Sequence, residues 1–408
     1  MEKKLSEYAK LIVRVGINVQ KGQTIVVRCP VECAAFGRMI AEEAYEAGAR
    51  EVVMQWTDDK LARMKYLKAS NDVFDEVPAW FKTFCYEYAG KKAGLVGIMA
   101  SDPENLKGVD PERLRRNAVA MGRELKDYQE QQMRNEFPWC GVSIPAPAWA
   151  VKVFPGCAPE EAVAKLWDAI FAAVRVTGDG GEVKRWEEHV ANMQKRAKIL
   201  NEHNFAKLVY KNSLGTNFTV ELPEKHAWVC CGEKARTGVP FMANMPTEEI
   251  FTLPKKTGVN GVICSSLPMS IDGNIVRDIR FTVKDGKIVE ATASEGQETL
   301  LKKLDVDEGA RYFGEVALVP HKSPISEMGI LFYNTLFDEN ASCHFAFGKA
   351  YPAFRDADTA SSEELAARGA NDSVVHVDFM VGTPDLSIIG VKTDGKEIPV
   401  FAGGNFAF

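Results

Sequence analysis

The first half of the chain alternates strand-like and helix-like segments, and this order limits the possible folds more than any other feature. An apolar run at residues 24–28 predicts a buried strand, residues 36–47 have helical spacing, and residues 51–55 predict a second strand. Two strands joined through a helix run parallel in one sheet. We therefore expect an amino-terminal α/β domain built on a parallel sheet.

Further elements of the same kind follow up to about residue 180. They comprise helices over residues 3–15, 111–131 and 159–176, and strands at 94–99 and 142–144. A glycine-rich stretch at residues 177–181 then interrupts the pattern. We place the domain boundary there, so that residues 1–180 form the α/β domain. This half contains no GxGxxG motif and no phosphate loop.

The second half changes to short alternating strands. A long helix is expected over residues 182–200, with His189 beside its apolar stripe as a surface residue. The pairs Asp285-Gly286 and Asp394-Gly395 are typical of tight β-hairpins. Residues 181–408 are therefore predicted to form a β-rich α+β domain. The expected fold class is α/β, with two unlike domains.

Composition excludes several classes of partner. The 408 residues carry a formal net charge of -6, which gives no basic surface for a nucleic-acid backbone. No run approaches the roughly 20 apolar residues of a membrane span, and the charged start of the chain lacks an apolar signal core. We expect a soluble cytoplasmic protein with neither nucleic-acid nor membrane partners.

Nine cysteines are spread along the chain without paired CxxC clusters. This distribution favours reduced thiols over a disulfide framework. Cys29, Cys33, Cys230 and Cys231 are interpreted as packing residues.

Ligand-type side chains lie in short apolar segments of the last third. His376 and Asp378 alternate in a strand-like run, so they point to one face. Glu315 opens another apolar run, where an unpaired carboxylate would cost several kcal/mol unless a cation faced it. His344 adds a second imidazole, in a segment expected to be half-buried. Carboxylates with two imidazoles suit zinc, cobalt or manganese, so the pattern indicates a metal site.

Several candidate residues also have an ordinary explanation. Glu248 and Glu249 would fit an acidic pair at the start of a helix, and His376 with Asp378 would fit a hydrogen-bonded core pair. Cys343, next to a histidine, suggests a cysteine nucleophile, but sequence neighbours in a strand face opposite ways. A binding protein with a closed structural metal site is the alternative to an enzyme.

Four segments carry a resemblance to a known family. They are Asn-Met-Pro-Thr-Glu-Glu-Ile-Phe at 244–251, Gly-Glu-Val-Ala-Leu-Val at 314–319, Leu-Phe-Asp-Glu-Asn-Ala-Ser-Cys-His at 336–344, and His-Val-Asp-Phe-Met at 376–380. In these segments, and over nearly its whole length, the chain resembles the aminopeptidase T / aminopeptidase S family of two-metal exopeptidases.

The resemblance implies roles for individual residues. The metal ligands of that family fall on Glu249, Glu315, His344, His376 and Asp378, and its catalytic tyrosine falls on Tyr351. Two divalent ions, of zinc, cobalt, manganese or magnesium, would activate a water that removes the first residue of peptides with a free amino terminus. Glu249 would be able to bridge the ions, Tyr351 would stabilise the oxyanion, and Glu315 or Glu248 would carry the proton to the leaving amine. Homodimers in the family imply a homodimer here.

Overall fold

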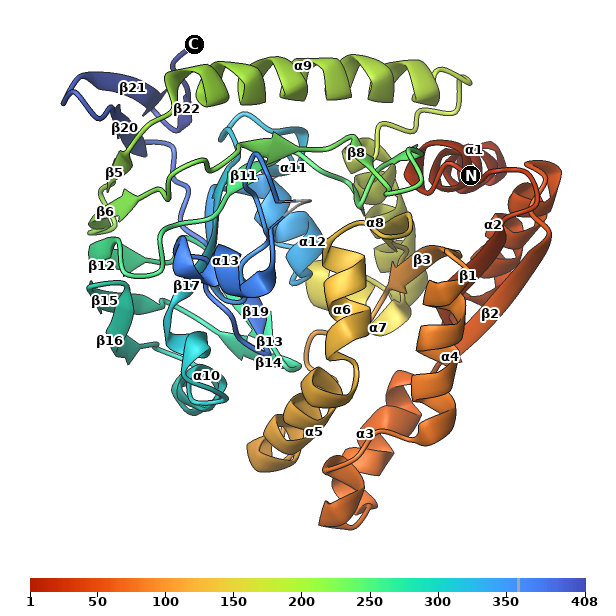
Figure 1. Ribbon diagram of the computed structural model, residues 1–408. Coiled ribbons are helices and arrows are strands. Elements are labelled where there is room, and N and C mark those ends of the chain that lie inside the picture. Colours follow the sequence, from red (N-terminus) through yellow and green to blue (C-terminus); the bar gives the residue numbers. More distant parts are fainter. Residues whose placement is uncertain (358–359) are drawn as a thin grey trace. The chain divides into compact units, whose positions relative to one another are not determined.

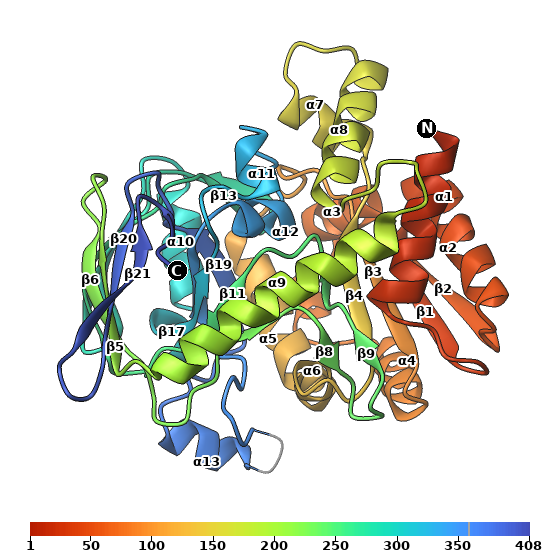
Figure 2. The same ribbon diagram turned by 90° about the horizontal axis from the view of Figure 1, so that it is seen from above.

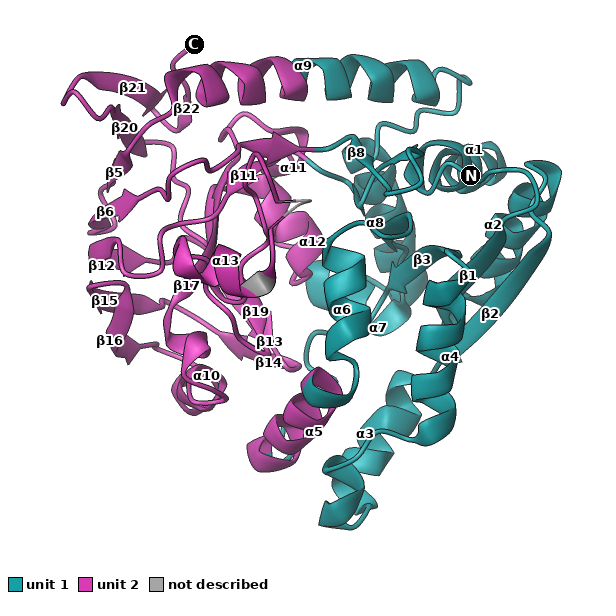
Figure 3. Cartoon of the chain, viewed as in Figure 1, with its two compact units in different colours: residues 1–110, 123–192, 231–247 teal, residues 111–122, 193–230, 248–408 magenta. Residues whose placement is uncertain are grey.

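The structure is a computed structural model that describes residues 1–357 and 360–408. The chain separates into two compact units (Figure 3). Unit 1 contains residues 1–110, 123–192 and 231–247, and unit 2 contains residues 111–122, 193–230 and 248–408. The boundary that we placed at residue 180 stays a prediction.

Unit 1 is built on a five-stranded parallel sheet with the order β10-β4-β3-β1-β2. Its strands are β1 (Thr24–Pro30), β2 (Glu51–Thr57), β3 (Gly94–Met99), β4 (Trp139–Ser143) and β10 (Asn244–Met245). Ile25, Val26 and Val27 of the interior strand β1 are buried, as a strand covered on both faces requires. The parallel sheet expected from the strand-helix-strand order is confirmed.

Helices are the other main elements of unit 1. They are α1 (Glu2–Leu11), α2 (Ala34–Glu46), α3 (Asp59–Lys68), α4 (Ala79–Gly90), α6 (Lys126–Met133), α7 (Pro147–Val153) and α8 (Pro159–Ala173). The single helix expected over residues 111–131 is wrong, because α5 (Pro111–Glu124) ends before α6 begins. Leu125 leaves the helical backbone, with φ -112 and ψ 16, and buries its side chain.

Helix α9 (Glu182–His203) contributes residues to both units (Figure 3). His189 on this helix is half-buried, and its Nε2 lies 2.7 Å from the carbonyl oxygen of Thr247. The expectation of a surface histidine is therefore wrong, because the ring contacts the carbonyl oxygen of Thr247 and packs against the indole of Trp186.

Unit 2 is dominated by two antiparallel sheets, visible as layers in Figures 1 and 2. The five-stranded sheet has the order β19-β18-β17-β11-β7, with strands β7 (Val229–Cys230), β11 (Ile250–Thr252), β17 (Phe313–Leu318), β18 (His344–Gly348) and β19 (His376–Met380). The eight-stranded sheet contains β5 (Lys207–Lys211), β6 (Asn217–Glu221), β12 (Val259–Cys264), β15 (Arg280–Lys284), β16 (Lys287–Thr292), β20 (Ser387–Val391), β21 (Glu397–Ala402) and β22 (Asn405–Phe406). The predicted β-rich second half is confirmed.

Aromatic side chains fill the space between these two sheets. The Phe345 ring lies 5.3 Å from Tyr210 and 5.1 Å from Phe218, and the Phe281 ring lies 5.1 Å from Phe379. Edge-to-face contacts of this kind stabilise a core beyond the area that they bury. Because strand side chains alternate, this packing turns the residues on either side of Phe345 and Phe379 to the opposite face.

Smaller elements complete the described chain. They are the hairpins β8 (Glu233–Lys234) with β9 (Pro240–Phe241) and β13 (Met269–Ile271) with β14 (Asn274–Val276), and the helices α10 (Gln297–Leu304), α11 (Pro324–Glu327), α12 (Thr335–Asp338) and α13 (Ser362–Ala367). The predicted turn between β15 and β16 is confirmed, with positive φ at Asp285 and Gly286. All nine cysteines are free. Over residues 1–357 and 360–408, no helix is long and apolar enough to cross a membrane.

Candidate metal centre

Strand register gathers ligand-type residues on the face of the five-stranded sheet that is turned away from the aromatic core. Glu315 on β17 lies opposite Ala346 on β18, and Ala346 lies opposite Asp378 on β19. Residues that lie opposite one another in an antiparallel pair project from the same face, about 5 Å apart. The small side chain of Ala346 therefore separates two carboxylates and leaves space between them.

The two histidines project from the same face. His344 lies opposite Ala317, and His376 lies opposite Gly348. His344 is completely buried, so the expectation of a half-buried segment is wrong. It begins β18, between buried neighbours on both adjoining strands.

Glu249 reaches the same cluster from the segment that precedes β11. Its Oε2 lies 3.0 Å from Nε2 of His344. The backbone N–H of Glu248 donates to Oδ1 of Asn340 at 2.6 Å, which fastens this segment to the turn before β18. The pair leads into a strand, so the alternative of acidic residues at the start of a helix is wrong.

Glu315 lies between the two histidines. Its Oε1 is 3.5 Å from Nε2 of His344, and its Oε2 is 3.5 Å from Nε2 of His376. His376 Nε2 is also 3.4 Å from Oδ1 of Asp378. Since the two oxygens of Glu315 face different imidazoles, Glu315 is a better bridging candidate than Glu249.

Hydrogen bonds made by the second ring nitrogen, Nδ1, fix the orientation of both imidazoles. His344 Nδ1 lies 3.0 Å from the carbonyl oxygens of Glu339 and Ser342, and His376 Nδ1 lies 2.7 Å from that of Lys349. Carbonyl oxygens only accept, so each Nδ1 carries the proton and donates. In a neutral imidazole, Nε2 then directs its lone pair toward carboxylate oxygens.

That arrangement repels unless a proton on Nε2 or a metal cation lies between the groups. No hydrogen-bond partner with acceptable geometry reaches the buried Nε2 of His344 within the described chain. Histidine ligands of metals commonly donate their second nitrogen to a carbonyl in this way. The donor set and the orphaned nitrogen therefore fit a divalent cation.

A sixth candidate ligand, Glu339, was missed in the sequence. The ligand atoms of Glu339, His344 and Asp378 all lie within 4.8 Å of one another. Two other sets meet the same limit, namely Glu249, Glu315 and His344, and Glu315, His376 and Asp378. Glu339 lies in the 3-10 turn Glu339–Ala341, and its place in the segment 336–344 was the signal available.

Crowded charge shifts the protonation of these groups. Burial raises the pKa of Glu315, with the neighbouring carboxylate of Glu249 adding to the rise, and burial raises the pKa of Glu339 well above its usual value. Burial alone would lower the pKa of His376, but the carboxylates of Asp378 and Glu315 raise it to about 9. The site thus concentrates negative charge in a buried place, where a cation lowers the electrostatic cost.

Tyr351 borders this cluster in the segment after β18. Its ring lies 5.1 Å from the ring of His376 and 5.8 Å from the ring of Phe251. Burial raises the pKa of its hydroxyl well above the usual value, and the carboxylate of Glu315 adds to this. The hydroxyl is therefore protonated near neutral pH and able to donate.

The cysteine-nucleophile alternative is not supported by the geometry of Cys343. Its Sγ donates to the carbonyl oxygen of Val319 at 3.2 Å. Burial raises the pKa of this thiol to about 12, so a thiolate is scarce at neutral pH.

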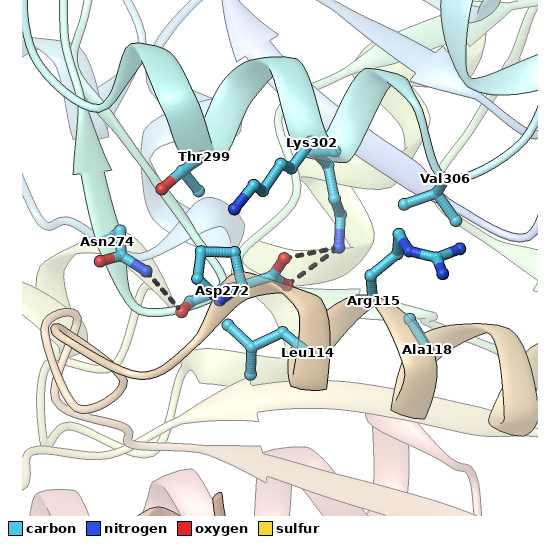
Figure 4. A pocket seen from close by; sticks show the side chains of 10 residues that line it. Leu114, Arg115, Ala118, Asp272, Asn274, Thr299, Lys302 and Val306 are labelled. Atoms are coloured by element: carbon cyan, nitrogen blue, oxygen red, sulfur yellow. Dashed lines mark hydrogen bonds and ion pairs between the residues drawn. The ribbon is translucent and has the colours of Figure 1, made fainter. Parts of the chain in front are cut away.

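A hollow in unit 2 has chemistry different from that of the ligand cluster (Figure 4). It lies between α5 and α10 and contains three cationic side chains. Lys303 binds both oxygens of Asp272 at 2.9 and 3.0 Å. Lys302 and Arg115 are paired with Glu298 and Glu112, respectively. Because each cation already has a carboxylate partner, this hollow is an ion-paired surface.

Comparison with known proteins identifies the family of the chain. The model of the thermophilic metalloprotease (M29) family matches residues 1–406. The chain belongs to this metalloprotease family. It is 44% identical to aminopeptidase AmpS of Bacillus subtilis (strain 168) over 407 residues, which cover 99% of this chain and 98% of that protein. It is also 44% identical to aminopeptidase 2 of Geobacillus stearothermophilus over 408 residues, which cover 100% of this chain and 98% of the relative.

A solved structure extends the agreement to the fold of this M29 metalloprotease. Wild-type AmpT from Thermus thermophilus matches with a TM-score of 0.91 and 36% identity, over 100% of both chains. The predicted family and fold class are thereby confirmed. The roles of the individual site residues stay predictions.

Proposed function

We propose that this M29 metalloprotease is an aminopeptidase that removes the first residue from peptides with a free amino terminus. The observation that carries the proposal is the pair of imidazoles, each with Nδ1 on a carbonyl and Nε2 among carboxylates. The names of the aminopeptidase relatives support the choice of reaction.

The proposed cofactor is a pair of divalent ions. Glu249, Glu315 and His344 would hold one ion, and Glu315, His376 and Asp378 would hold the other, with Glu339 as a further ligand. Mixed imidazole and carboxylate donors favour zinc, cobalt or manganese over magnesium. Bound together, such ions supply an acidified water for attack on the first peptide carbonyl.

The chain's own residues would position the substrate and handle the proton. Tyr351 is proposed to donate its hydroxyl to the oxyanion that develops on the carbonyl oxygen. Glu315 and Glu248 were both candidates for moving the proton to the leaving amine. Both oxygens of Glu315 face imidazoles, so Glu315 is better suited to be a ligand shared by the two ions. This favours Glu248 as the residue that transfers the proton.

Turnover of chromogenic aminoacyl amides tests the proposal directly. Purified, metal-depleted protein is assayed with and without added zinc, cobalt or manganese. Hydrolysis that requires metal, and that stops when the substrate amine is acetylated, supports an aminopeptidase. Metal binding without turnover would favour the alternative, a protein with a closed structural site.

We also propose a homodimer, supported by an unusual helix in unit 1. None of the residues of α3 is buried, and Leu61, Met64 and Leu67 along it are 60%, 47% and 47% exposed. Such an apolar stripe is typical of an interaction surface. Light scattering of the Leu61→Glu/Met64→Glu variant tests this: a monomer supports the surface as the dimer contact, and an unchanged dimer excludes it.

The proposed location is the cytoplasm. Nine unpaired cysteines, seven of them buried, suit a reducing compartment.

A further inference from the structure

One backbone carbonyl determines how His376 faces the cluster. The oxygen of Lys349 accepts the hydrogen bond from His376 Nδ1 at 2.7 Å. His344, in contrast, uses two carbonyls of its own preceding turn, at Glu339 and Ser342. The orientation of His376 therefore depends on a segment that is 27 residues away in sequence.

Residues 348–350 form the segment that carries this carbonyl, and each of their backbone amides donates a hydrogen bond. The N–H of Gly348 donates to Tyr312 O at 2.7 Å, that of Lys349 to Val375 O at 2.7 Å, and that of Ala350 to Asn371 O at 2.9 Å. The backbone at this point has little freedom to move aside.

Gly314, next to Glu315 on β17, lies directly against this carbonyl. A Cβ at position 314 would lie 2.3 Å from the oxygen of Lys349, 2.5 Å from its carbonyl carbon and 2.6 Å from the oxygen of Gly348. All three are backbone atoms of the held segment, so an added methyl group has to displace the Lys349 carbonyl itself.

Asn371 holds the same segment from another side. Its buried side-chain Nδ2 donates to the carbonyls of Gly348 at 2.7 Å and Gly309 at 2.8 Å. The two acceptors fix the orientation of the amide, because a flipped side chain would place its oxygen against both carbonyls. The side-chain Oδ1 has no hydrogen-bond partner within the described residues, so the donating group is the one in use.

We propose that Gly314 and Asn371 are positioning residues that orient His376 for metal binding through the carbonyl of Lys349. Gly314 has no side chain, and the Asn371 amide donates to backbone carbonyls. This inference rests on the proposed metal centre and adds to it the residues that hold one imidazole in place. Loss of such outer contacts typically weakens metal binding about 10–100-fold.

The first test compares Gly314→Ala with Gly97→Ala. Gly97 also lies in a strand, β3, but an added Cβ there meets nothing within 4 Å. Zinc binding is measured by calorimetry on metal-depleted protein. The Nδ1–H resonance of His376 is followed by NMR on protein with ¹⁵N-labelled histidine, and is assigned with His376→Ala. We expect Gly314→Ala to bind one zinc ion about 10–100-fold more weakly and to lose protection of this proton from exchange. Gly97→Ala keeps both properties.

The second test approaches the carbonyl from Asn371. Asn371→Leu keeps the branching of the side chain at Cγ and removes the two donated hydrogen bonds. It is expected to produce the same two changes, and it replaces Gly314→Ala as the test if that variant does not fold. Wild-type zinc affinity and a protected His376 proton in either folded variant would overturn the inference while leaving the metal centre intact. If wild-type protein itself binds no zinc, cobalt or manganese, the proposed function fails instead.

Discussion

Nε2 of His344 lies 3.0 Å from Oε2 of Glu249, and no hydrogen bond of acceptable geometry joins them. Nδ1 of the same ring is already committed to two carbonyl oxygens. Without a proton on Nε2, its lone pair faces this carboxylate, and a metal cation between the two groups removes the repulsion.

Dialysed, active protein is expected to contain two divalent ions per chain, measured by elemental analysis. Chelation should abolish turnover and lower the thermal midpoint, because ions that bind only the folded state stabilise it. At a free metal concentration of about 100 Kd, the gain is about 2.7 kcal/mol. One ion per chain, or none, in active protein would contradict the two-metal arrangement.

Replacing His376 or Asp378 by alanine should abolish activity and leave the fold largely intact. Both side chains project from the edge strand β19 toward the cluster, and both are only partly buried, so truncation removes ligands without opening the aromatic core. Activity and metal content are measured together with far-UV circular dichroism. Wild-type turnover with unchanged metal content in either variant would remove that residue from the ligand set.

Glu339 is the ligand that a matched amide replacement tests best. Glu339→Gln keeps the shape but replaces the carboxyl group near His344 and Asp378 with an amide, so metal affinity should fall by about tenfold or more. Glu363→Gln serves as the control, because it lies on the surface helix α13. Equal zinc affinity in Glu339→Gln and wild type would show that Glu339 is not a metal ligand.

The sequence revealed those parts of this site that depend on strand alternation. Period-two spacing correctly placed His376 and Asp378 on one strand, and the apolar run identified the strand of Glu315. It did not reveal Glu339, because that carboxylate is brought in by a 3-10 turn with no periodic pattern.

The sequence also did not predict that His344 is completely buried or that Glu315 lies between the two histidines. Both depend on the register between β17 and β18, which shifts between Phe313 and Glu315. Such a shift follows from long-range packing, since a slip by one residue exchanges the two faces of a strand. Similarly, α5 ends where Leu125 leaves the helical backbone and buries its side chain. Local helix propensity does not encode such tertiary packing.

Phe251 is predicted to select substrates with large apolar first residues. It lies opposite Ala317, on the same face as Glu315, and is half-buried beside Tyr351. Phe251→Ala should lower kcat/KM for leucyl and phenylalanyl amides about tenfold more than for alanyl amides, as loss of an apolar contact does. Phe251→Leu should retain most of the preference. An equal effect on all three substrates would remove Phe251 from the specificity determinants.

Tyr351 supports the last prediction, because its hydroxyl is protonated and its ring contacts that of His376. If this hydroxyl donates to the oxyanion, Tyr351→Phe removes an interaction made mainly in the transition state. Loss of such a donor costs about 3–4 kcal/mol, so kcat should fall roughly 10²–10³-fold with little change in KM. Metal content should not change, since the phenol is not among the ligands.

The matched control for this substitution is Tyr210→Phe. Tyr210 is buried in the aromatic core on the other face of the sheet, and its hydroxyl has no hydrogen-bond partner among the described residues. Removing that oxygen should leave kcat unchanged. Steady-state kinetics on the two variants separate the roles, since a general effect of losing a buried hydroxyl would appear in both. A kcat for Tyr351→Phe within roughly threefold of wild type would assign Tyr351 to packing, because a lost oxyanion donor costs far more than that.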